Sequence, residues 1–447
     1  MGHCPFFFCL RAVYVWPYTE ATGVTLTASD RILILAPHPD DEVIGCAGII
    51  QEAVARKIPV KIVFLTNGDN NEWAFLLYRK HPVIVPGAVR AMGAIRQTEA
   101  IAAAAVLGLN RADLLFLGYP DFGTLAMWRA HWSSADAYRS MLTRARAVPY
   151  QNSYRPDALY KAEEILADIT SIIQEYKPTK IFLSHPGDHN PDHAALFLFT
   201  QIALWDLGND LSIQQFPYVV HCKHWPLPRG WHPDEPLCPP ELSRENVIWQ
   251  KYMLEPARVA LKRVALQKHL SEYTSSPSYL LSFVRSNELF GGFPIQALAP
   301  DRAGVRLFDT LAGKDTTPTD TSDVFSGIVR ETVSRVDNTL VFLLDFNRPI
   351  AKQADIYIYC FGYRKDRPFR DMPKIQVRLG LLKSGLYDQR KKRPFDAIGV
   401  TRTPRTIKVV IPLSLLGDPH YIMTSSASYL GEVPLDRPAW YTLSLAP

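Results

Sequence analysis

Short apolar runs alternate with longer segments of helical periodicity between residues 31 and 224. The apolar runs, each ended by turn or polar residues, are predicted strands at 31–37, 60–67, 114–120, 180–186 and 218–224. The segments between them carry apolar residues at helical spacing and are predicted helices at 42–57, 96–109, 156–176 and 191–207. This alternation predicts a Rossmann-like α/β fold, a mostly parallel sheet with helices on both faces.

The pattern changes after about residue 300. A polar hinge, "TPTDTSDV", is followed by short strand-like runs such as "NTLVFLLDF", "ADIYIYCFGY" and "TIKVVIPLSLL". Short strands at this spacing predict a C-terminal all-β sandwich. We therefore expect an N-terminal extension at 1–30, an α/β domain at 31–300 and an accessory β-sandwich at 301–447. Residues 122–155, rich in Trp, Tyr and Arg, are an inserted excursion and a candidate lid.

Composition narrows the class of protein. Apolar residues make up 47% and charged residues 21% of the 447 residues, as in soluble globular proteins. A net charge of +5, with no basic stripe, gives no argument for nucleic acid binding. The six cysteines form no CxxC pair, which argues against a disulfide framework and a cysteine zinc site.

Localisation and assembly are less constrained by the sequence. No apolar run reaches the roughly 18 residues of a membrane helix. The apolar N-terminus lacks a basic region before it, so we interpret it as an extension packing on the body of a cytoplasmic protein. A degenerate export signal is the alternative. The oligomeric state is left open.

The first chemically rich stretch is "ILAPHPDDEV", residues 34–43. His38, Asp40, Asp41 and Glu42 follow a predicted buried strand and therefore lie at the carboxyl edge of the sheet, where ligands of such folds collect. Adjacent acids repel one another, and either a cation or the start of a helix offsets that cost.

A second polar stretch, "SHPGDHNPDHAALF" at 184–197, also follows a predicted strand and opens a helix. It holds His185, Asp188, His189, Asp192 and His193. A His/Asp/His set drawn from both stretches gives three protein ligands and one open position, as in catalytic zinc sites. Asp40 would then lie beside the metal as a general base. Helix-start acids and hydrogen-bonded core histidines are the alternative; a second "HPDE" at 232–235 lacks the strand and helix and is interpreted as a solvated turn.

Together, "PHPDDE" and "HPGDHNPDH" resemble the LmbE/PIG-L family of zinc-dependent N-acetylglucosaminyl deacetylases. The similarity covers about residues 30–290 and includes "TNGD" (66–69), "RQTEAIAAAAVLG" (96–108) and "LGYPDFG" (117–123). It implies zinc on His38, Asp41 and His193, a site that would also accept other divalent ions. It makes Asp40 the base for the attacking water and an N-acetylated sugar or glycoconjugate the substrate.

The resemblance also implies neighbouring roles. Arg96 and Asp121 match positions that line the sugar pocket; a helix-surface ion pair and a turn acid are their alternatives. Asp192 either orients His193 from behind or is an acid at a helix start. The aromatic residues Tyr359, Tyr363 and Trp440 of the sandwich either form a carbohydrate platform or belong to its core and edges.

One position departs from the family pattern. Many members carry a histidine three residues before the last ligand, where this chain has Asn190. Asn190 can donate a hydrogen bond to an oxyanion but cannot transfer a proton. His189, Asp40 acting twice, or His224 near a strand end are the candidates for the acid. A buried packing histidine is the alternative for His224. Rival functions are a non-catalytic sugar-binding protein and a metal-dependent hydrolase of another bond, such as a phosphoester.

Overall fold

Five parallel strands form the central sheet of the first part of the chain. The computed structural model describes residues 23–70, 85–133, 135–208, 212–240, 242, 247–300, 304–310, 327–380, 383–431, 433–436 and 439–445. The strand order is β3-β2-β1-β4-β5. The strands are β1 Ile32–Ala36, β2 Val60–Thr66, β3 Leu114–Tyr119, β4 Lys180–Ser184 and β5 Gln214–Tyr218.

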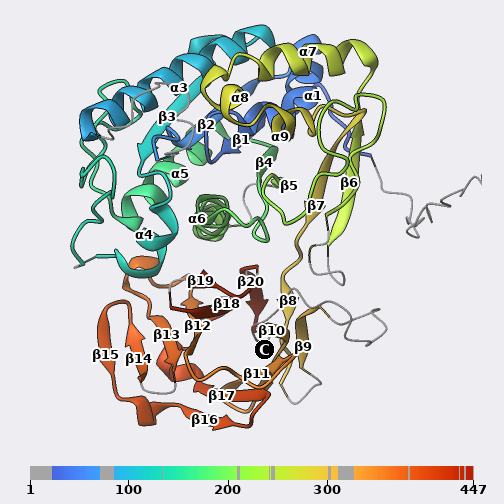
Figure 1. Cartoon of the computed structure of the whole chain (residues 1–447). Coiled ribbons are helices and arrows are strands. Elements are labelled where there is room, and N and C mark those ends of the chain that lie inside the picture. The colour runs from blue at the N-terminus through green and yellow to red at the C-terminus, as the bar shows by residue number, and fades with distance from the viewer. Residues whose placement is uncertain are drawn as a thin grey trace, which may run out of the picture.

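Helices cover both faces of this sheet (Figure 1). They are α1 Asp41–Ala55, α3 Pro86–Val106, α4 Thr124–Ala130, α5 Ala162–Tyr176, α6 Pro191–Leu207, α7 Pro256–Leu266, α8 Leu270–Ser275 and α9 Pro277–Leu281. A short turn of 3₁₀ helix, Arg111–Asp113, precedes β3. An antiparallel strand pair, β6 Ile248–Met253 with β7 Asn287–Gly292, lies beside the sheet.

The sequence of β1, "ILILA", explains the two-sided cover. All five residues are buried. Because side chains alternate along a strand, Ile32, Ile34 and Ala36 enter one apolar cluster while Leu33 and Leu35 enter another on the opposite face. The predicted parallel sheet with helices on both faces is confirmed.

Two further sheets make up the C-terminal part, which confirms the predicted β-sandwich. Their orders are β16-β17-β11-β10-β9 and β15-β14-β13-β12-β18-β20-β8, with β19 beside β18. Their strands are β8 Gln296–Ala297, β9 Val305–Asp309, β10 Ile328–Val336, β11 Thr339–Phe346, β12 Ala354–Tyr363, β13 Lys374–Leu379, β14 Ser384–Asp388, β15 Lys391–Arg393, β16 Gly399–Arg402, β17 Thr406–Pro412, β18 Tyr421–Leu430, β19 Val433–Pro434 and β20 Tyr441–Ser444. Three 3₁₀ turns lie among them, Phe369–Asp371, Phe395–Ala397 and Leu413–Leu416.

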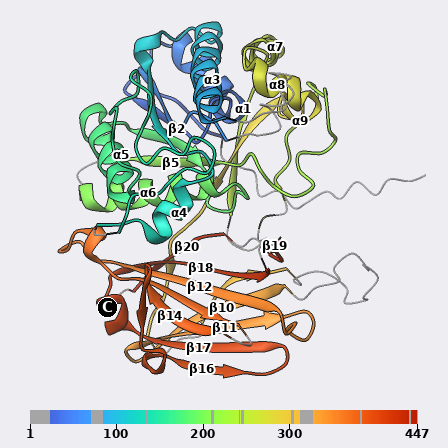
Figure 2. The same cartoon turned by 60° about the vertical axis from the view of Figure 1, so that its left-hand side comes forward.

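The sandwich packs against the α/β part through α4 and α6, as both cartoons show (Figures 1 and 2). Trp128 of α4 lies 5.2 Å from the ring of Phe369, 5.7 Å from Phe361 and 6.2 Å from Trp440. One apolar cluster therefore continues from the α/β sheet into the sandwich. The excursion at 122–155 contributes this packing helix, so α4 is part of an interface between the two halves.

Tyr359, Tyr363 and Trp440 lie in that same interface. Their exposed fractions are 5%, 1% and 2%. They therefore do not form an exposed platform; they are packed interface residues.

Three further predictions concern the N-terminal extension, the domain boundaries and the location in the cell. Residues 1–22, most of the expected N-terminal extension, lie outside the described residues, and the domain boundaries and the cytoplasmic location stay predictions. Among the helices that the structure describes, none has the length and apolar character needed to cross a bilayer.

Candidate metal centre

The topology explains why the two polar stretches meet. β1 and β4 are adjacent and parallel, with Ile32 opposite Lys180. The strand after β1 lies on one side of this pair and the strand after β4 on the other, so the order of the sheet reverses between them. Ligands bind at such a switch point, outside the carboxyl ends of the strands. The segment from His38 to Asp41 and the segment from His185 to His193 both leave the sheet at this point.

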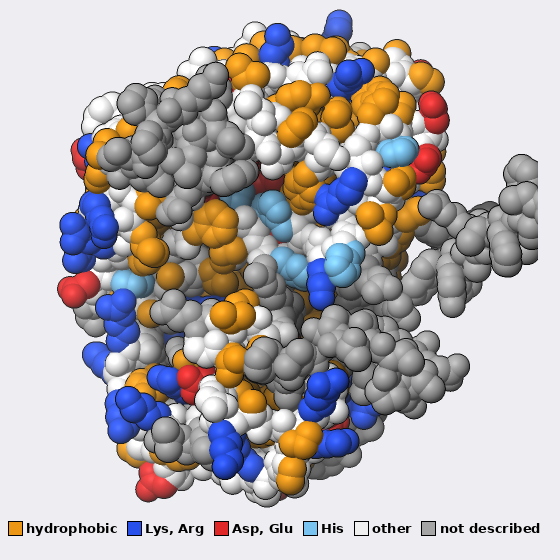
Figure 3. Space-filling view, viewed as in Figure 1, with side chains coloured by type: hydrophobic (Ala, Val, Ile, Leu, Met, Phe, Trp, Pro, Cys, Tyr) orange, Lys and Arg blue, Asp and Glu red, His pale blue; other side chains and the backbone are white. Residues whose placement is uncertain are grey.

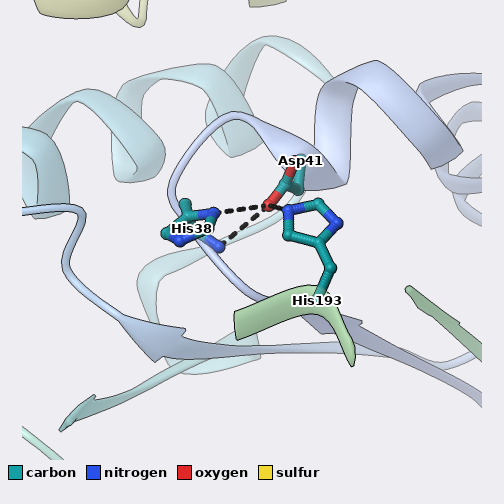
Figure 4. Close-up of side chains that lie close together, drawn as sticks. All are labelled: His38, Asp41 and His193. Atoms are coloured by element: carbon teal, nitrogen blue, oxygen red, sulfur yellow. Dashed lines mark hydrogen bonds and ion pairs between the residues drawn. The ribbon is translucent and has the colours of Figure 1, made fainter. Parts of the chain in front are cut away.

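His38, Asp41 and His193 converge there on a common centre (Figure 4). Oδ2 of Asp41 lies 3.2 Å from Nδ1 of His38 and 3.1 Å from Nε2 of His193. Two ligand atoms that each lie ~2.0 Å from a tetrahedral zinc ion are roughly 3.3 Å apart. The spacing and the donor set therefore fit a divalent metal ion. Both ring nitrogens of the buried His193 lack regular hydrogen-bond geometry, which leaves Nε2 open to a metal ion.

A buried carboxylate stands behind each imidazole. Nδ1 of His193 lies 3.1 Å from Asp188, and Nε2 of His38 lies 3.1 Å from Asp121 and 3.3 Å from Asp192. Such carboxylates fix the ring orientation of metal-binding histidines. The expectation that Asp192 orients His193 is corrected, because Asp192 contacts His38 and Asp188 takes the place behind His193.

Asp188 and Asp192 reach opposite sides of the loop that opens α6. Asn190 is the N-cap of this helix: its side chain accepts the N–H of Asp192 at 2.9 Å, and its own N–H donates to Asp188 at 2.9 Å. The alternation of the two acids around the cap sends one to each histidine. This geometry comes from the cap and is not visible in residue spacing.

The pKa values of the three candidate ligands depend on one another and on the nearby carboxylates. Burial lowers the pKa of His193, but Asp188 and Asp41 outweigh it and raise that pKa to about 9. Burial raises the pKa of Asp41, yet the two histidines hold it well below its usual range. Burial also lowers the pKa of His38, but the neighbouring carboxylates, of which Asp121 has the largest effect, raise it well above its usual value. In this acidic surrounding a divalent cation would take the place of the protons on the two rings.

Asp40 lies at the N-cap of α1 with φ of 125°, a conformation that non-glycine residues rarely adopt. Its N–H donates to Glu42 at 2.9 Å, and Glu42 in turn contacts His269 at 2.8 Å. Its carboxylate faces Arg96 at 3.7 Å. Burial raises the pKa of Asp40 well above its ordinary value, although Arg96 opposes the shift. A strained, buried acid beside a metal centre is suited to proton transfer.

Arg96 is buried, with 4% of its surface exposed, so the helix-surface alternative is wrong. Its guanidinium donates to the backbone oxygens of Pro39 at 2.7 Å and Gly68 at 2.9 Å, and pairs with Glu272 at 2.7 Å. It thereby ties the loops after β1 and β2 to α8.

A cavity of about 180 Å³ opens beside the centre. The predicted site residues that line it are His38, Asp40, Asp41, Arg96, Asp121 and Asn190. Glu272 and Tyr279 add walls from the helical segment that follows the sheet. Figure 3 shows histidine side chains around a hollow on this face of the molecule, with acidic atoms beside them. We call this cavity the catalytic pocket.

Two predicted residues lie elsewhere. His189 lines neighbouring cavities and not the catalytic pocket, and His224 is exposed with a φ of 56°. The histidine that the sequence analysis missed is His221, which lines the pocket and lies with its ring 4.9 Å from that of His193. Burial lowers the pKa of His221 to about 4.

The error over His224 follows from a wrong strand boundary. The predicted strand at 218–224 is wrong, because β5 ends at Tyr218. The backbone N–H groups of Val220 and His221 donate to Asp188, at 2.8 and 2.9 Å, instead of to a neighbouring strand. In the sequence "YVVH", residues 218–221, His221 is the first histidine after the true end of β5, and this closeness to the strand end could have identified it.

Comparison with known proteins adds independent information. A model of the PIG-L family, described as GlcNAc-PI de-N-acetylase, matches residues 33–204. Two curated relatives are named 1D-myo-inositol 2-acetamido-2-deoxy-alpha-D-glucopyranoside deacetylase. The one from Nocardia farcinica is 27% identical over 277 residues, and the one from Rhodococcus jostii is 24% identical over 270 residues. Each match covers 56% of this chain and 83% of the relative.

Solved structures resemble the chain more distantly. An N,N'-diacetylchitobiose deacetylase from Pyrococcus horikoshii is 18% identical with a TM-score of 0.34, covering 58% of this chain and 82% of its own. The 4-carboxy-2-hydroxymuconate hydratase GalB from Pseudomonas putida is 17% identical with a TM-score of 0.33, covering 59% and 97%.

Proposed function

This chain belongs to the PIG-L family through residues 33–204, and on that premise we propose that it is a metal-dependent hydrolase that removes an acetyl group from an N-acetylated amino sugar or its glycoside. The observation that carries the proposal is the convergence of His38, Asp41 and His193 beside an acid that is not one of the three. The substrate class follows from the family description and from the deacetylase names of the curated relatives.

His38, Asp41 and His193 would hold the metal ion, with zinc as the first choice for a site of two imidazoles and one carboxylate. When bound, the metal would polarise the amide carbonyl and activate water. Asp188 and Asp192 keep the two rings oriented from behind. The other two candidate ligand groups each share a histidine with this one, so the described residues favour a single ion.

Asp40 is proposed as the general base. It lines the catalytic pocket next to Asp41, and its raised pKa lets its carboxylate hold a proton taken from the attacking water. Arg96, at 3.7 Å, keeps the carboxylate in place and limits how far its pKa rises.

The remaining pocket residues surround the place of the sugar. Asp121, from the loop after β3, lies 3.1 Å from His38 and has its other carboxylate oxygen occupied by the N–H of Asn70 at 2.8 Å. Asp121 therefore positions His38, and its edge can accept a sugar hydroxyl. Asn190 is proposed to donate its amide N–H to the developing oxyanion. Many family members carry a histidine at the position of Asn190. In this chain His221 places an imidazole in the pocket instead.

The test is the substitution Asp40→Asn. Asn has nearly the shape of Asp and tolerates positive φ, so metal content and fold should persist. We expect acetate release from N-acetylglucosamine glycosides by the zinc-loaded protein to fall by about 10²–10⁴-fold, the range for loss of a general base.

The matched control is Asp234→Asn, in the exposed second "HPDE" sequence at 232–235, which should leave the rate unchanged. A wild-type protein that releases no acetate from any of a panel of N-acetylated sugars would refute the proposed function. Equal rates for the wild type and Asp40→Asn would refute the role of Asp40.

A further inference from the structure

A second and larger cavity lies between the catalytic pocket and the β-sandwich. Its volume is about 550 Å³, and Phe122, Asn190 and His221 line both cavities. Pockets for drug-sized ligands usually enclose roughly 300–1,000 Å³. The catalytic pocket, at about 180 Å³, is smaller than that range and suits one sugar ring, whereas the second cavity has room for a further ring. We call the second cavity the interdomain cavity.

One face of β18 forms the far wall. Ser425, Ala427 and Tyr429 line the cavity at alternate positions and therefore share the face toward the α/β part. Further along the same face, Met423 is buried in the interdomain apolar cluster and Tyr421 stacks on Trp205 at 4.6 Å. The interface is thus closed where β18 carries large side chains and hollow where it carries Ser and Ala.

Aromatic rings held in place by other rings border this hollow. Tyr429 meets Tyr357 edge to face at 5.5 Å, and Trp440 lies 5.6 Å from Tyr359. The guanidinium of Arg129, another lining residue, lies 4.2 Å over the ring of Tyr359. Rigid aromatic faces beside a hydrogen-bond donor suit a sugar ring, which has an apolar face and polar edges.

Phe122 stands at the junction of the two cavities. Its φ is 56°, which a bulky residue adopts only where its surroundings impose it, and its N–H donates to Asp192 at 2.6 Å. Its side chain is nevertheless 49% exposed. A constrained aromatic residue with its ring exposed between two cavities provides a stacking surface that both can use.

We propose that the β-sandwich completes the substrate site: the second sugar ring of an N-acetylated glycoside binds in the interdomain cavity, against β18 and the ring of Phe122, while the first ring lies in the catalytic pocket. The inference rests on the proposed function and narrows its substrate to a glycoside of at least two rings. It gives the accessory sandwich a role in specificity.

The test compares two substrates of the full-length, zinc-loaded protein: methyl N-acetylglucosaminide and the disaccharide of two β-linked N-acetylglucosamine units. We expect a wild-type kcat/KM about tenfold higher for the disaccharide, since an interaction with a second ring lowers the transition state. Ala427→Trp fills the cavity and should remove this preference. Thr401→Trp adds the same side chain on exposed β16, in the other sheet of the sandwich, and should preserve it.

Tyr429→Ala is a second cavity variant, which keeps the test decisive if Ala427→Trp fails to fold. Tyr429 is only half-buried at the cavity rim, and its removal should raise KM for the disaccharide about fivefold, the effect of losing one aromatic contact. Equal kcat/KM for both substrates in the wild type, or a preference unchanged in both cavity variants, would overturn the inference while leaving the deacetylase function intact.

Calorimetric binding to Asp40→Asn separates the two hypotheses. Tighter binding of the disaccharide than of the methyl glycoside, lost when Ala427→Trp is added, supports the interdomain cavity even if no acetate is released by the wild type. Absence of acetate release from both substrates counts against the proposed function. Equal binding of the two ligands counts against the cavity.

Discussion

The carboxylate of Asp192 accepts the N–H groups of Phe122 at 2.6 Å and Thr124 at 3.1 Å, accepts the Thr124 hydroxyl, and lies 3.3 Å from His38. One buried side chain thus joins the start of α6, the loop after β3 and a candidate metal ligand. An acid with this many partners cannot be replaced by an amide without setting an N–H against another donor.

We therefore expect Asp192→Asn to weaken zinc binding by about 10–100-fold, the usual effect of losing a partner behind a metal-binding histidine. Zinc affinity is measured by competition with a chromogenic chelator, and the midpoint of thermal unfolding should fall in the same variant. Asp157→Asn, at an exposed turn, is the control. Unchanged zinc affinity in Asp192→Asn would contradict its assigned place behind His38.

Glu331, in the sandwich, is fully buried, and its Oε1 accepts the hydroxyl of Ser426 at 2.6 Å. Burial raises its pKa from 4.5 to about 7, although Ser426 opposes the shift. Because the folded state holds this proton more tightly than the unfolded chain, the stabilisation is complete below pH 4.5 and is lost as the pH rises through 7.

The expected loss is about 3 kcal/mol of unfolding free energy, at roughly 1.4 kcal/mol for each pKa unit. Glu331→Gln mimics the protonated form and should lack this decline between pH 4.5 and 8, as measured by urea unfolding. Glu255→Gln, an exposed site, should follow the wild type. Parallel pH profiles for the wild type and Glu331→Gln would exclude the effect.

At the scale of elements, the position of α1 sets the position of Asp40 and Asp41. A Cβ atom added at Gly45 would lie 2.7 Å from the ring of Tyr218, whose hydroxyl is fixed by a hydrogen bond to Leu35 at 3.0 Å. Gly45 therefore lets α1 lie directly against the ring of Tyr218, and any larger residue must push the helix or that ring aside.

Gly45→Ala is expected to destabilise the fold by about 1–3 kcal/mol, since the overlap outweighs the ~1 kcal/mol that Ala gains over Gly in a helix. Acetate release should fall with it, because the two acids move with α1. Gly87→Ala, in the first turn of α3 with no atom near the added Cβ, should be neutral or stabilising. The free energy of unfolding in denaturant and the rate of acetate release are measured for both variants. Equal stability of Gly45→Ala and the wild type would contradict the close packing of Gly45 on Tyr218.

Much of the element level was predictable and part of the site was not. The bounds of α6, Pro191–Leu207, agree with the predicted 191–207, because Asn190 caps the helix and Pro191 suits its first turn. The predicted strand at 218–224 was wrong, because Val219 and Val220 are buried by loop packing while the N–H groups of Val220 and His221 donate to Asp188. Apolar runs report burial, but burial alone does not make a strand.

At the scale of the whole molecule, the two halves share an apolar interface centred on Trp128, which is fully buried among Phe361, Phe369 and Trp440. An interface built like a core couples the unfolding of the parts it joins. The interdomain cavity lies beside this interface, so its shape depends on the same packing.

We expect the wild type to unfold in one calorimetric transition. Trp128→Ala should cost about 3–5 kcal/mol and divide the transition into two, one for each half. Trp231→Ala removes a partly exposed ring and should leave a single transition near the wild-type temperature. A single transition of unchanged temperature in Trp128→Ala would show that the interface contributes little.

The sequence by itself determined the alternating elements, the two polar stretches at strand ends, and the chemical types that bind a metal, because each depends on neighbours within a few residues. Only the tertiary structure decided that Asp188 stands behind His193, that Asp192 stands behind His38, and that His221 enters the pocket. It also set the sandwich beside that pocket. These outcomes depend on which loops meet at the switch point between β1 and β4, and such long-range contacts leave no periodic trace along the chain.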